Sequence, residues 1–441
     1  MLIEFSVANY RSFKEKVTFS MVAADLDGSD EKLKENNIFA VDEELSLVKS
    51  AAIYGANASG KSNIAKALNF MKNFMINSSK GTQSTDSIPI EPFRLSTETE
   101  HQPSFFELVF RLDKKIYRYG FEADRDKIVS EWLYYVPRKQ EKMLFERKLN
   151  KIKTARNYEA EVIIQQKLTR QNTLFLSVSA QFNVRIAQKA LQWLLSNLNI
   201  IFSVSAFHDY GGFIHTVELM KNSKNSIVMQ HCKSQIIELV KKLDIGVHGV
   251  EVDNEKITSE SLLNIPEDLK KFLSGIDEIP IVNTTHKKFD HDGNYKSTEQ
   301  FKLDEHESEG TKKIFALAGV LVTVFDYGKV LIIDEFDARL HPLISRAIVG
   351  LFNSKETNPR NAQLIFMTHD TNLLSPKIFR RDQIWFTEKN RYGATDLYSL
   401  AEYQIPDDAP FENDYIQGRY GAIPYIGNFK TWMTNSTSGG N

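Results

Sequence analysis

The sequence is nearly free of cysteine, since Cys232 is the only one among 441 residues. An internal disulfide is therefore excluded, which fits a reducing compartment. The chain also lacks any run of about 18 uncharged apolar residues, so no membrane span is expected and the cytoplasm is the expected setting. Neither sign of charge is in excess: 55 basic and 57 acidic residues leave a net charge of -2. No global field draws the protein to nucleic acid, although this total leaves room for a local basic patch.

Two stretches predict β-structure and a third predicts helices. The N-terminal "LIEFSVANYRSF" alternates apolar and polar residues, so it differs from a signal peptide and should form a hairpin with "EKVTFSMVA". Residues 103–136 alternate aromatic and charged residues, which predicts an antiparallel meander of three strands. Residues 140–275 contain amphipathic stretches and are expected to be mostly helical, without the sustained heptads of a long coiled coil.

The segment "GANASGKS" fits the pattern of a phosphate-binding loop, G-x-x-x-x-G-K-[ST], at residues 55–62. It follows an apolar strand and opens an amphipathic helix, which is the context that this motif requires. Its main-chain N–H groups and the helix N-terminus are expected to hold polyphosphate, with Lys61 reaching the outer phosphates and Ser62 binding Mg²⁺. The predicted binding residues are Gly55, Asn57, Ser59, Gly60, Lys61, Ser62 and Asn63.

Two adjacent acids, Asp334 and Glu335, follow the apolar run "VLII". Such a run predicts a buried strand, and open α/β sheets bind their ligands at the carboxyl ends of strands. Asp334 is expected to hold the metal through its water shell, and Glu335 to orient or deprotonate an attacking water. We call these two residues the acidic pair.

Two further features are spaced around the acidic pair. The polar segment "SEGTKK", residues 308–313, begins 26 residues before Asp334 (334 − 308) and is separated from it by one predicted helix. His369 follows Glu335 by 34 residues (369 − 335), at the end of the next apolar strand. A side chain at that strand end can face the terminal phosphate of a bound nucleotide.

This order of phosphate loop, S-x-G-x segment, acidic pair and strand-end histidine resembles that of ATP-binding-cassette (ABC) ATPases. The segments "NYRSF", "GKSN" and "DEFDARLHP" are similar to the SMC and RecF branch of that superfamily. More narrowly, "SEGTKKIFALAGVL", "MTHDTNLLSP" and "YIQGRYGAIPYI" resemble bacterial AAA-type ATPases of the RloA and AbiLi kind, which are associated with phage defence. The resemblance covers roughly residues 1 to 136 and 300 to 428.

The resemblance implies a head-to-head dimer, or a higher homo-oligomer, with ATP and Mg²⁺ between the protomers. Ser308 and Gly310 would contact the nucleotide held by Lys61 and Ser62 of the other chain. Arg11 would approach the same phosphates in its own chain, and His369 would help to position the water. Gln181 would be the glutamine that senses Mg²⁺. We call residues 308–313 the signature segment, after the corresponding motif of ABC transporters.

Two positions depart from the family pattern, and the signature segment has a second interpretation. Glu309 stands where the transporter signature has a glycine, and His341 stands where the loop after the catalytic acid usually has aspartate. Taken alone, "SEGTKK" is also typical of a helix start, with Ser308 as its cap and Glu309 in the first turn. The two interpretations are compatible, because a capped helix start is itself an anion site.

The expected fold is α/β: an ABC-ATPase head with an antiparallel β-meander lobe, a mostly parallel core sheet and a helical insertion lobe without a long coiled coil. Residues 1–136 would form the N-terminal half of the head and 280–428 its C-terminal half. Residues 137–279 would form the helical lobe, and 429–441 a flexible tail.

The expected function is that of an ATPase that dimerises on ATP and controls a separate effector, a nuclease-like partner in anti-phage defence. The alternative is a RecF-like ATPase that binds duplex DNA in repair, so a DNA contact stays open. An autonomous nuclease of the OLD type ranks lower, because 72 residues (441 − 369) follow His369. A scaffold that binds ATP without turnover is disfavoured by the intact Glu335.

Overall fold

The computed structural model describes residues 1–26, 30–81, 83–137, 140–158, 167–202, 210–221, 227–244, 246–256, 278–406 and 409–425. They belong to two compact units, Met1–Leu195 with Ile365–Asn441, and Ser196–Leu364. The lobes expected from the sequence have other boundaries, at 136/137 and 279/280. The expected flexible tail, 429–441, lies outside the described residues. Within the described ranges, no helix combines the length and the apolar character that crossing a membrane requires.

The first unit contains a seven-stranded antiparallel sheet in the order β10-β9-β8-β7-β6-β1-β2. The N-terminal hairpin predicted from period-two alternation is confirmed, with Phe5 opposite Phe19. The predicted meander is confirmed as β6–β8. The strands are β1 (Leu2–Ala8), β2 (Val17–Ser20), β6 (Ser104–Leu112), β7 (Lys115–Ala123), β8 (Ile128–Val136), β9 (Lys142–Lys148) and β10 (Lys151–Thr154).

The meander continues for two strands beyond the three expected. β9 and β10 lie within residues 140–275, so the expectation that this region is mostly helical is wrong at its start. The strand β9 carries four charged residues, yet its Arg147 is buried and bonds to the carbonyl oxygens of Leu149 and Thr173. The contact of β9 with the core is therefore partly polar. For this reason its sequence lacks the regular apolar and polar alternation from which a strand is predicted.

A buried acid anchors helix α4 (Phe175–Gln181) to this sheet. Glu131 of β8 accepts hydrogen bonds from the main-chain N–H groups of Phe175 (2.7 Å) and Leu176 (2.9 Å) at the start of the helix. Its carboxylate also lies 3.6 Å from the Arg147 guanidinium. Burial raises the pKa of Glu131, while Arg147 and the two N–H groups act to lower it. The acid supplies the cap that α4 lacks in its own sequence.

The second sheet of this unit has β5 (Ser50–Gly55) as an inner strand, and all residues of β5 are buried. The neighbouring strands lie in the order β16-β5-β17-β18, with β17 parallel to β5 and β18 antiparallel to β17. β18 pairs with β17 from Trp385 opposite Ser399 to Lys389 opposite Thr395. These strands are β16 (Gln363–Met367), β17 (Ile384–Lys389) and β18 (Thr395–Ser399).

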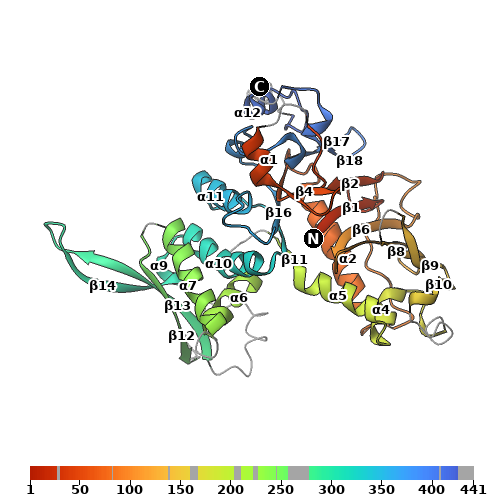
Figure 1. Cartoon of the computed structure of the whole chain (residues 1–441), viewed down its shortest axis with the longest axis horizontal. Coiled ribbons are helices and arrows are strands. Elements are labelled where there is room, and N and C mark those ends of the chain that lie inside the picture. The colour runs from red at the N-terminus through yellow and green to blue at the C-terminus, as the bar shows by residue number, and fades with distance from the viewer. Residues whose placement is uncertain are drawn as a thin grey trace, which may run out of the picture. The chain divides into compact units, whose positions relative to one another are not determined.

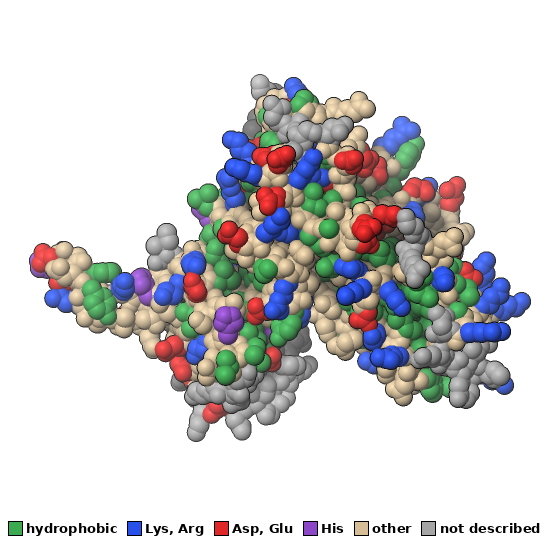
Figure 2. All heavy atoms as spheres, viewed as in Figure 1, with side chains coloured by type: hydrophobic (Ala, Val, Ile, Leu, Met, Phe, Trp, Pro, Cys, Tyr) green, Lys and Arg blue, Asp and Glu red, His purple; other side chains and the backbone are tan. Residues whose placement is uncertain are grey.

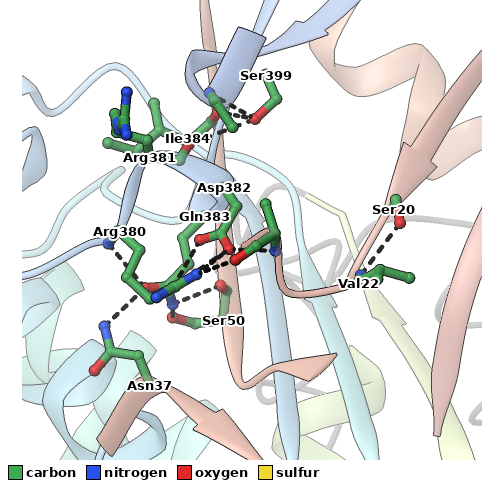
Figure 3. A network of polar contacts seen from close by, with 12 residues as sticks. Ser20, Val22, Asn37, Ser50, Arg380, Arg381, Asp382, Gln383, Ile384 and Ser399 are labelled. Atoms are coloured by element: carbon green, nitrogen blue, oxygen red, sulfur yellow. Dashed lines mark hydrogen bonds and ion pairs between the residues drawn. The ribbon is translucent and has the colours of Figure 1, made fainter. Parts of the chain in front are cut away.

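A polar network fixes the point where β17 begins (Figure 3). Arg380 and Asp382 form a buried ion pair of 2.6 Å, and Arg380 also donates to the Ala24 carbonyl. Gln383 donates to the Ser50 carbonyl at the start of β5 and accepts from Asn37. The network joins the N-terminal hundred residues to the last hundred, so it sets the register of β17 against β5.

Short elements and helices complete the first unit. Most of them lie in the segment Met1–Leu195, and the longest is α2, which begins in the phosphate loop. They are α1 (Glu31–Asn37), β3 (Ile38–Ala40), β4 (Ser46–Val48), α2 (Lys61–Asn77), η1 (Arg156–Tyr158), α5 (Arg185–Asn197), η3 (Thr371–Leu373), η4 (Arg381–Gln383), η5 (Leu400–Glu402) and α12 (Phe411–Ile416).

The second unit is built around α10 (Glu309–Tyr327), which is buried on most of its surface. Helix α10 can approach α6 (Tyr210–Lys221) closely, because Gly319 leaves space for Thr216 of that helix. The Thr216 hydroxyl accepts a hydrogen bond from the Gly319 N–H at 3.0 Å. Gly328 ends this helix in a left-handed conformation with φ 60°, which glycine adopts without strain. The other elements of this part are β11 (Leu198–Ile201), α6 (Tyr210–Lys221), α7 (Ile227–Leu243), β15 (Val330–Ile333) and α11 (Pro342–Phe352), with β11 parallel to β15.

A separate three-stranded antiparallel sheet, in the order β12-β13-β14, also belongs to the second unit. It comprises β12 (Gly249–Lys256), β13 (Glu278–Phe289) and β14 (Tyr295–Lys302), and α9 (Leu303–His306) follows. β13 and β14 are joined by a turn at Asp292-Gly293, and the two strands extend beyond helices α7 and α10 (Figure 1). β14 ends at Lys302, and the short helix α9 and Glu307 connect it to the signature segment.

Candidate functional site

The phosphate loop connects the end of β5 to the start of α2, as the sequence predicts. Gly60 immediately precedes the helix with φ +115°, a conformation that a side chain would strain. Lys61 is 7% exposed, and its ammonium donates to the carbonyl oxygens of Gly55 (2.7 Å) and Ala56 (3.0 Å). Ser62 is half-buried in the first helical turn, while Asn57 is exposed. The first N–H groups of α2 and the Lys61 charge thus converge on one loop.

Two threonines from the last third of the chain support this loop. Thr387 of β17 shares a 2.6 Å hydrogen bond with the Ser59 hydroxyl. Thr395 of β18 donates to the Ser59 carbonyl at 2.7 Å, and a Cβ added to Gly60 would overlap its side chain. Neither threonine is predicted from the sequence, because no local motif surrounds them. Only the pairing of β5, β17 and β18 brings them to the loop.

The turn that contains Arg11 also lies at the start of α2. Asn63 donates to the Ser12 hydroxyl at 2.7 Å, and the Thr395 N–H donates to the Ser12 carbonyl at the same distance. Arg11 itself adopts φ +51°, and its guanidinium is 2.7 Å from the Glu91 carboxylate. The structure therefore brings the Arg11 turn to the phosphate loop, with the side chain paired to Glu91.

His369 is exposed two residues after β16 ends. The residues on either side of it contact β5 close to the phosphate loop. Thr368 donates its N–H to the Ile53 carbonyl, and the Tyr54 hydroxyl donates to the Asp370 carbonyl, both at 3.2 Å. His369 thus lies at the same end of the sheet as Gly55, which is where the sequence places it.

Gln181 lies at the opposite end of α2 from the phosphate loop. Its side-chain amide donates to the Ser79 carbonyl at 3.0 Å, just beyond the last helical residue, Asn77. Ser62 is in the first turn of the same helix, so at 1.5 Å per residue the two ends are on the order of 20 Å apart. The structure does not bring Gln181 to Ser62. The position of Gln181 in the sequence is not enough to assign it as the glutamine that senses Mg²⁺. The location of its helix, α4, depends on the hydrogen bonds to Glu131.

The acidic pair ends β15 in the second unit, as expected for a buried apolar strand. Asp334 is 5% exposed, and its carboxylate accepts from the Glu335 N–H at 3.2 Å. The Glu335 side chain is exposed, and its main chain has φ +51°. One acid therefore points into the protein and the next into solvent. The left-handed turn between them is uncommon for a residue with a side chain.

The signature segment begins α10, and the prediction that Ser308 caps this helix is confirmed. The Ser308 hydroxyl accepts from the Thr311 N–H at 3.1 Å, and the Thr311 hydroxyl bonds to Asp244. Ser308 and Glu309 are exposed and Gly310 is half-buried, so the start of the segment is accessible at the surface. His341, which departs from the family pattern, is the N-cap of α11 and accepts from the Leu343 N–H at 3.2 Å.

The predicted residues thus fall into two sets. The first unit holds the phosphate loop, Arg11 and His369, and the second holds the acidic pair, Ser308 and Gly310. In the described parts of the chain, no three or more histidine, cysteine or acidic side chains gather as a metal site would require. Mg²⁺ bound with a nucleotide needs fewer, since its shell is made up of one or two protein oxygens, phosphate oxygens and several water molecules. The Ser62 hydroxyl and the Asp334 carboxylate are donors of the required kind.

Comparison with known proteins identifies one matching family model, described as "AAA domain, putative AbiEii toxin, Type IV TA system", over residues 50–375. No curated protein matches the sequence. Among solved structures, the chain is similar to an SMC head bound to the C-terminal winged-helix domain of ScpA: 16% identity, 90% of this chain and 97% of that chain covered, TM-score 0.40.

Two further solved structures are similar at comparable levels. The SMC head domain from Thermotoga maritima has 13% identity, with 92% of this chain and 99% of that chain covered and a TM-score of 0.38. The recombination mediator protein RecF-ATPrS of the RecFOR pathway has 12% identity, with 90% and 98% covered and a TM-score of 0.36.

The support of the phosphate loop by Thr395 predicts that Gly60→Ala prevents nucleotide binding. The added methyl group would overlap Thr395 and strain the left-handed conformation of residue 60. Binding of a fluorescent ATP analogue should fall by more than about tenfold, a loss of at least 1.4 kcal/mol. Gly350→Ala is the matched control, because its Cβ would meet nothing within 4 Å on α11. Binding by Gly60→Ala at the parent affinity would contradict the proposed geometry.

Proposed function

The chain belongs to the AAA domain family described as "AAA domain, putative AbiEii toxin, Type IV TA system", and on this basis we propose that it is an ATPase of the RloA and AbiLi kind. The observation that carries the proposal is the complete phosphate loop, folded between a buried strand and a helix N-terminus. Such a loop binds the polyphosphate of ATP mainly by main-chain N–H groups. Lys61, already among the loop carbonyls, is close to where the outer phosphates would lie.

Hydrolysis would be carried out by residues at the carboxyl ends of β15 and β16. Glu335, with its exposed carboxylate, would orient or deprotonate the attacking water, and His369 would help to hold that water. Asp334 and Ser62 would hold Mg²⁺. When bound, the ion would neutralise charge that develops on the phosphates. The buried position of Asp334 supports a binding role, and the exposure of Glu335 supports a role towards substrate.

We also propose that two chains meet head to head on ATP. The exposed start of α10 supports this step, because Ser308 and Glu309 lie at the surface and the positive end of a 19-residue helix favours an anion carried by another molecule. Each site would then be complete only in the dimer, so turnover should be slow. Dimer closure would be the signal passed to a separate effector. The family description, which names a toxin–antitoxin system, supports a defence role of this kind.

A contact with duplex DNA is a second candidate function, supported by a specific cluster of charges. Figure 2 shows lysine and arginine side chains gathered over the end of the first sheet, where β9 and β10 lie. The exposed members are Lys142, Lys148, Lys151, Lys153 and Arg156. Lys148 and Lys151 are direct cross-strand partners, a placement that costs stability unless an anion lies between them.

Replacement of Glu335 tests the catalytic assignment. Glu335→Gln keeps the size of the side chain but removes the base, so ATP hydrolysis should fall by about 100-fold or more while ATP affinity stays at the parent value. Phosphate release and calorimetric binding would measure the two quantities. Glu356→Gln, an exposed acid elsewhere in the second unit, is the control and should change neither. Parent-rate hydrolysis by Glu335→Gln would show that another group is the base.

Replacement of Ser308 tests the dimer. Ser308→Arg places a bulky side chain at the proposed contact, so ATP-dependent dimerisation measured by light scattering should be lost while ATP binding is kept. Because this change also removes the helix cap, Ser308→Ala serves as a second variant that loses only the cap, at a cost of about 1 kcal/mol. The exposed Ser297→Arg on β14 controls for added charge. Parent-like dimerisation and turnover in Ser308→Arg would exclude the signature segment from the interface.

Neutralising the β9–β10 lysines tests the DNA contact. Replacing Lys142, Lys148, Lys151 and Lys153 by Gln should weaken duplex binding and lower the slope of log affinity against log salt, by up to about 0.9 per lost phosphate contact. The control replaces Lys287, Lys288 and Lys296 on β13 and β14, which should leave the slope unchanged. If the parent protein shows no salt-dependent DNA binding, the DNA candidate is excluded and the effector proposal stands alone.

A further inference from the structure

The two lysines that end the signature segment lie in different environments. Lys312 is half-buried at the surface and pairs with Glu309 one helical turn earlier at 3.0 Å. Lys313 is only 1% exposed, although nothing in the sequence sets it apart from its neighbour. A buried ammonium is costly unless its N–H groups are satisfied. The surroundings of Lys313 therefore call for a physical explanation.

The Lys313 ammonium bonds to three carbonyl oxygens of the loop that follows the acidic pair. Its Nζ is 3.2 Å from the oxygen of Glu335, 2.9 Å from that of Phe336 and 2.9 Å from that of Ala338. An ammonium has three donors, so this loop alone can occupy all of them. One side chain of α10 thus binds three of the four carbonyl groups of residues 335–338.

The loop that Lys313 binds is conformationally unfavourable by itself. Glu335 and Arg339, one at each end of the segment, have φ values of +51° and +65°. Residues with side chains avoid this left-handed region and hold it only where surrounding contacts impose it. The three bonds from Lys313 are contacts of this kind, because they turn the carbonyls of the loop towards one point.

Two other residues of the signature segment face the same loop. Glu309 forms an ion pair with Arg339. Gly310 lies so close that a Cβ there would be 2.9 Å from the Arg339 carbonyl oxygen. The signature segment therefore contacts the loop after the acidic pair through an ion pair, a close backbone approach and a buried ammonium.

We propose that Lys313 is a positioning residue that fixes the main chain at Glu335 and links the signature segment to it. This inference rests on the proposed function, in which Glu335 is the catalytic base and Ser308 meets the nucleotide of a second chain. A shift in the first turn of α10 on contact with that nucleotide would move the Lys313 ammonium, and with it the carbonyls of residues 335–338. Binding at the signature segment would in this way adjust the base of the same chain.

Hydrogen exchange on the full-length protein tests the positioning directly, without assuming any activity. Lys313→Met keeps the length of the side chain and removes the three donors, so exchange at the amides of residues 334–341 should speed up by about tenfold or more. Exchange over residues 55–65 should not change. Lys312→Met is the matched control from the adjacent helix position and should leave both segments as in the parent.

Steady-state kinetics test whether the position of the loop affects ATP hydrolysis. Lys313→Met should lower kcat by about tenfold or more, while KM and the affinity for ATP stay within about twofold of the parent, because the phosphate loop is intact. If Lys313→Met fails to fold, Lys313→Arg keeps the buried charge but cannot converge three bonds on one nitrogen, so it should show smaller changes in the same direction.

Two results would overturn the proposal. One is parent-like exchange over residues 334–341 in a folded Lys313→Met or Lys313→Arg. The other is faster exchange with an unchanged kcat, while Glu335→Gln abolishes hydrolysis. Failure of the underlying function is seen separately, as hydrolysis by Glu335→Gln at the parent rate, whereas the exchange result concerns the loop alone.

Discussion

The parallel pairing of β5 with β17 is the constraint on which the phosphate loop depends. Its register places Thr387 opposite Gly55, and this sets the hydroxyl of Thr387 against Ser59 inside the loop. A slip of one residue would turn every side chain of β17 to the other face of the sheet. The buried ion pair of Arg380 and Asp382, and the amide of Gln383 on Ser50, hold that register from the start of both strands. Polar contacts at one end of the sheet therefore determine the anion site at the other.

A second constraint of the same physical kind operates in the other unit. Lys61 and Lys313 each bind carbonyl oxygens of a tight loop at the end of a buried strand. In both places a single ammonium replaces the hydrogen bonds that a regular strand or helix would have provided. In the phosphate loop the lysine is the first residue of α2, the helix that the loop opens, whereas Lys313 reaches the loop after the acidic pair from α10.

The parts that sequence could predict are those whose cause is local. The phosphate loop, the Ser308 cap, the stop at Gly328 and the strand before the acidic pair are each determined by a few adjacent residues. Thr387, Thr395 and Lys313 could not be found in this way, because their roles arise from contacts between segments far apart in the chain. Lys313 differs from Lys312 only in the face of α10 on which it lies. Gln181 is the opposite case. Its residue type suits a Mg²⁺-sensing role, but the sequence does not show where its helix lies, because that depends on the contact of α4 with Glu131.

The position of β5 between β16 and β17 has a consequence for the newly made chain. The last residue of β5 is Gly55, whereas β16 begins at Gln363 and β17 at Ile384. Both neighbours leave the ribosome only after some 300 further residues, and pairings of such sequence separation are slow to form. The phosphate loop therefore lacks its supporting strands until β17 and β18, residues 384–399, have been translated. A chain that stops before these strands would carry the phosphate-loop sequence without Thr387 and Thr395, the two residues that bond to Ser59 inside the loop.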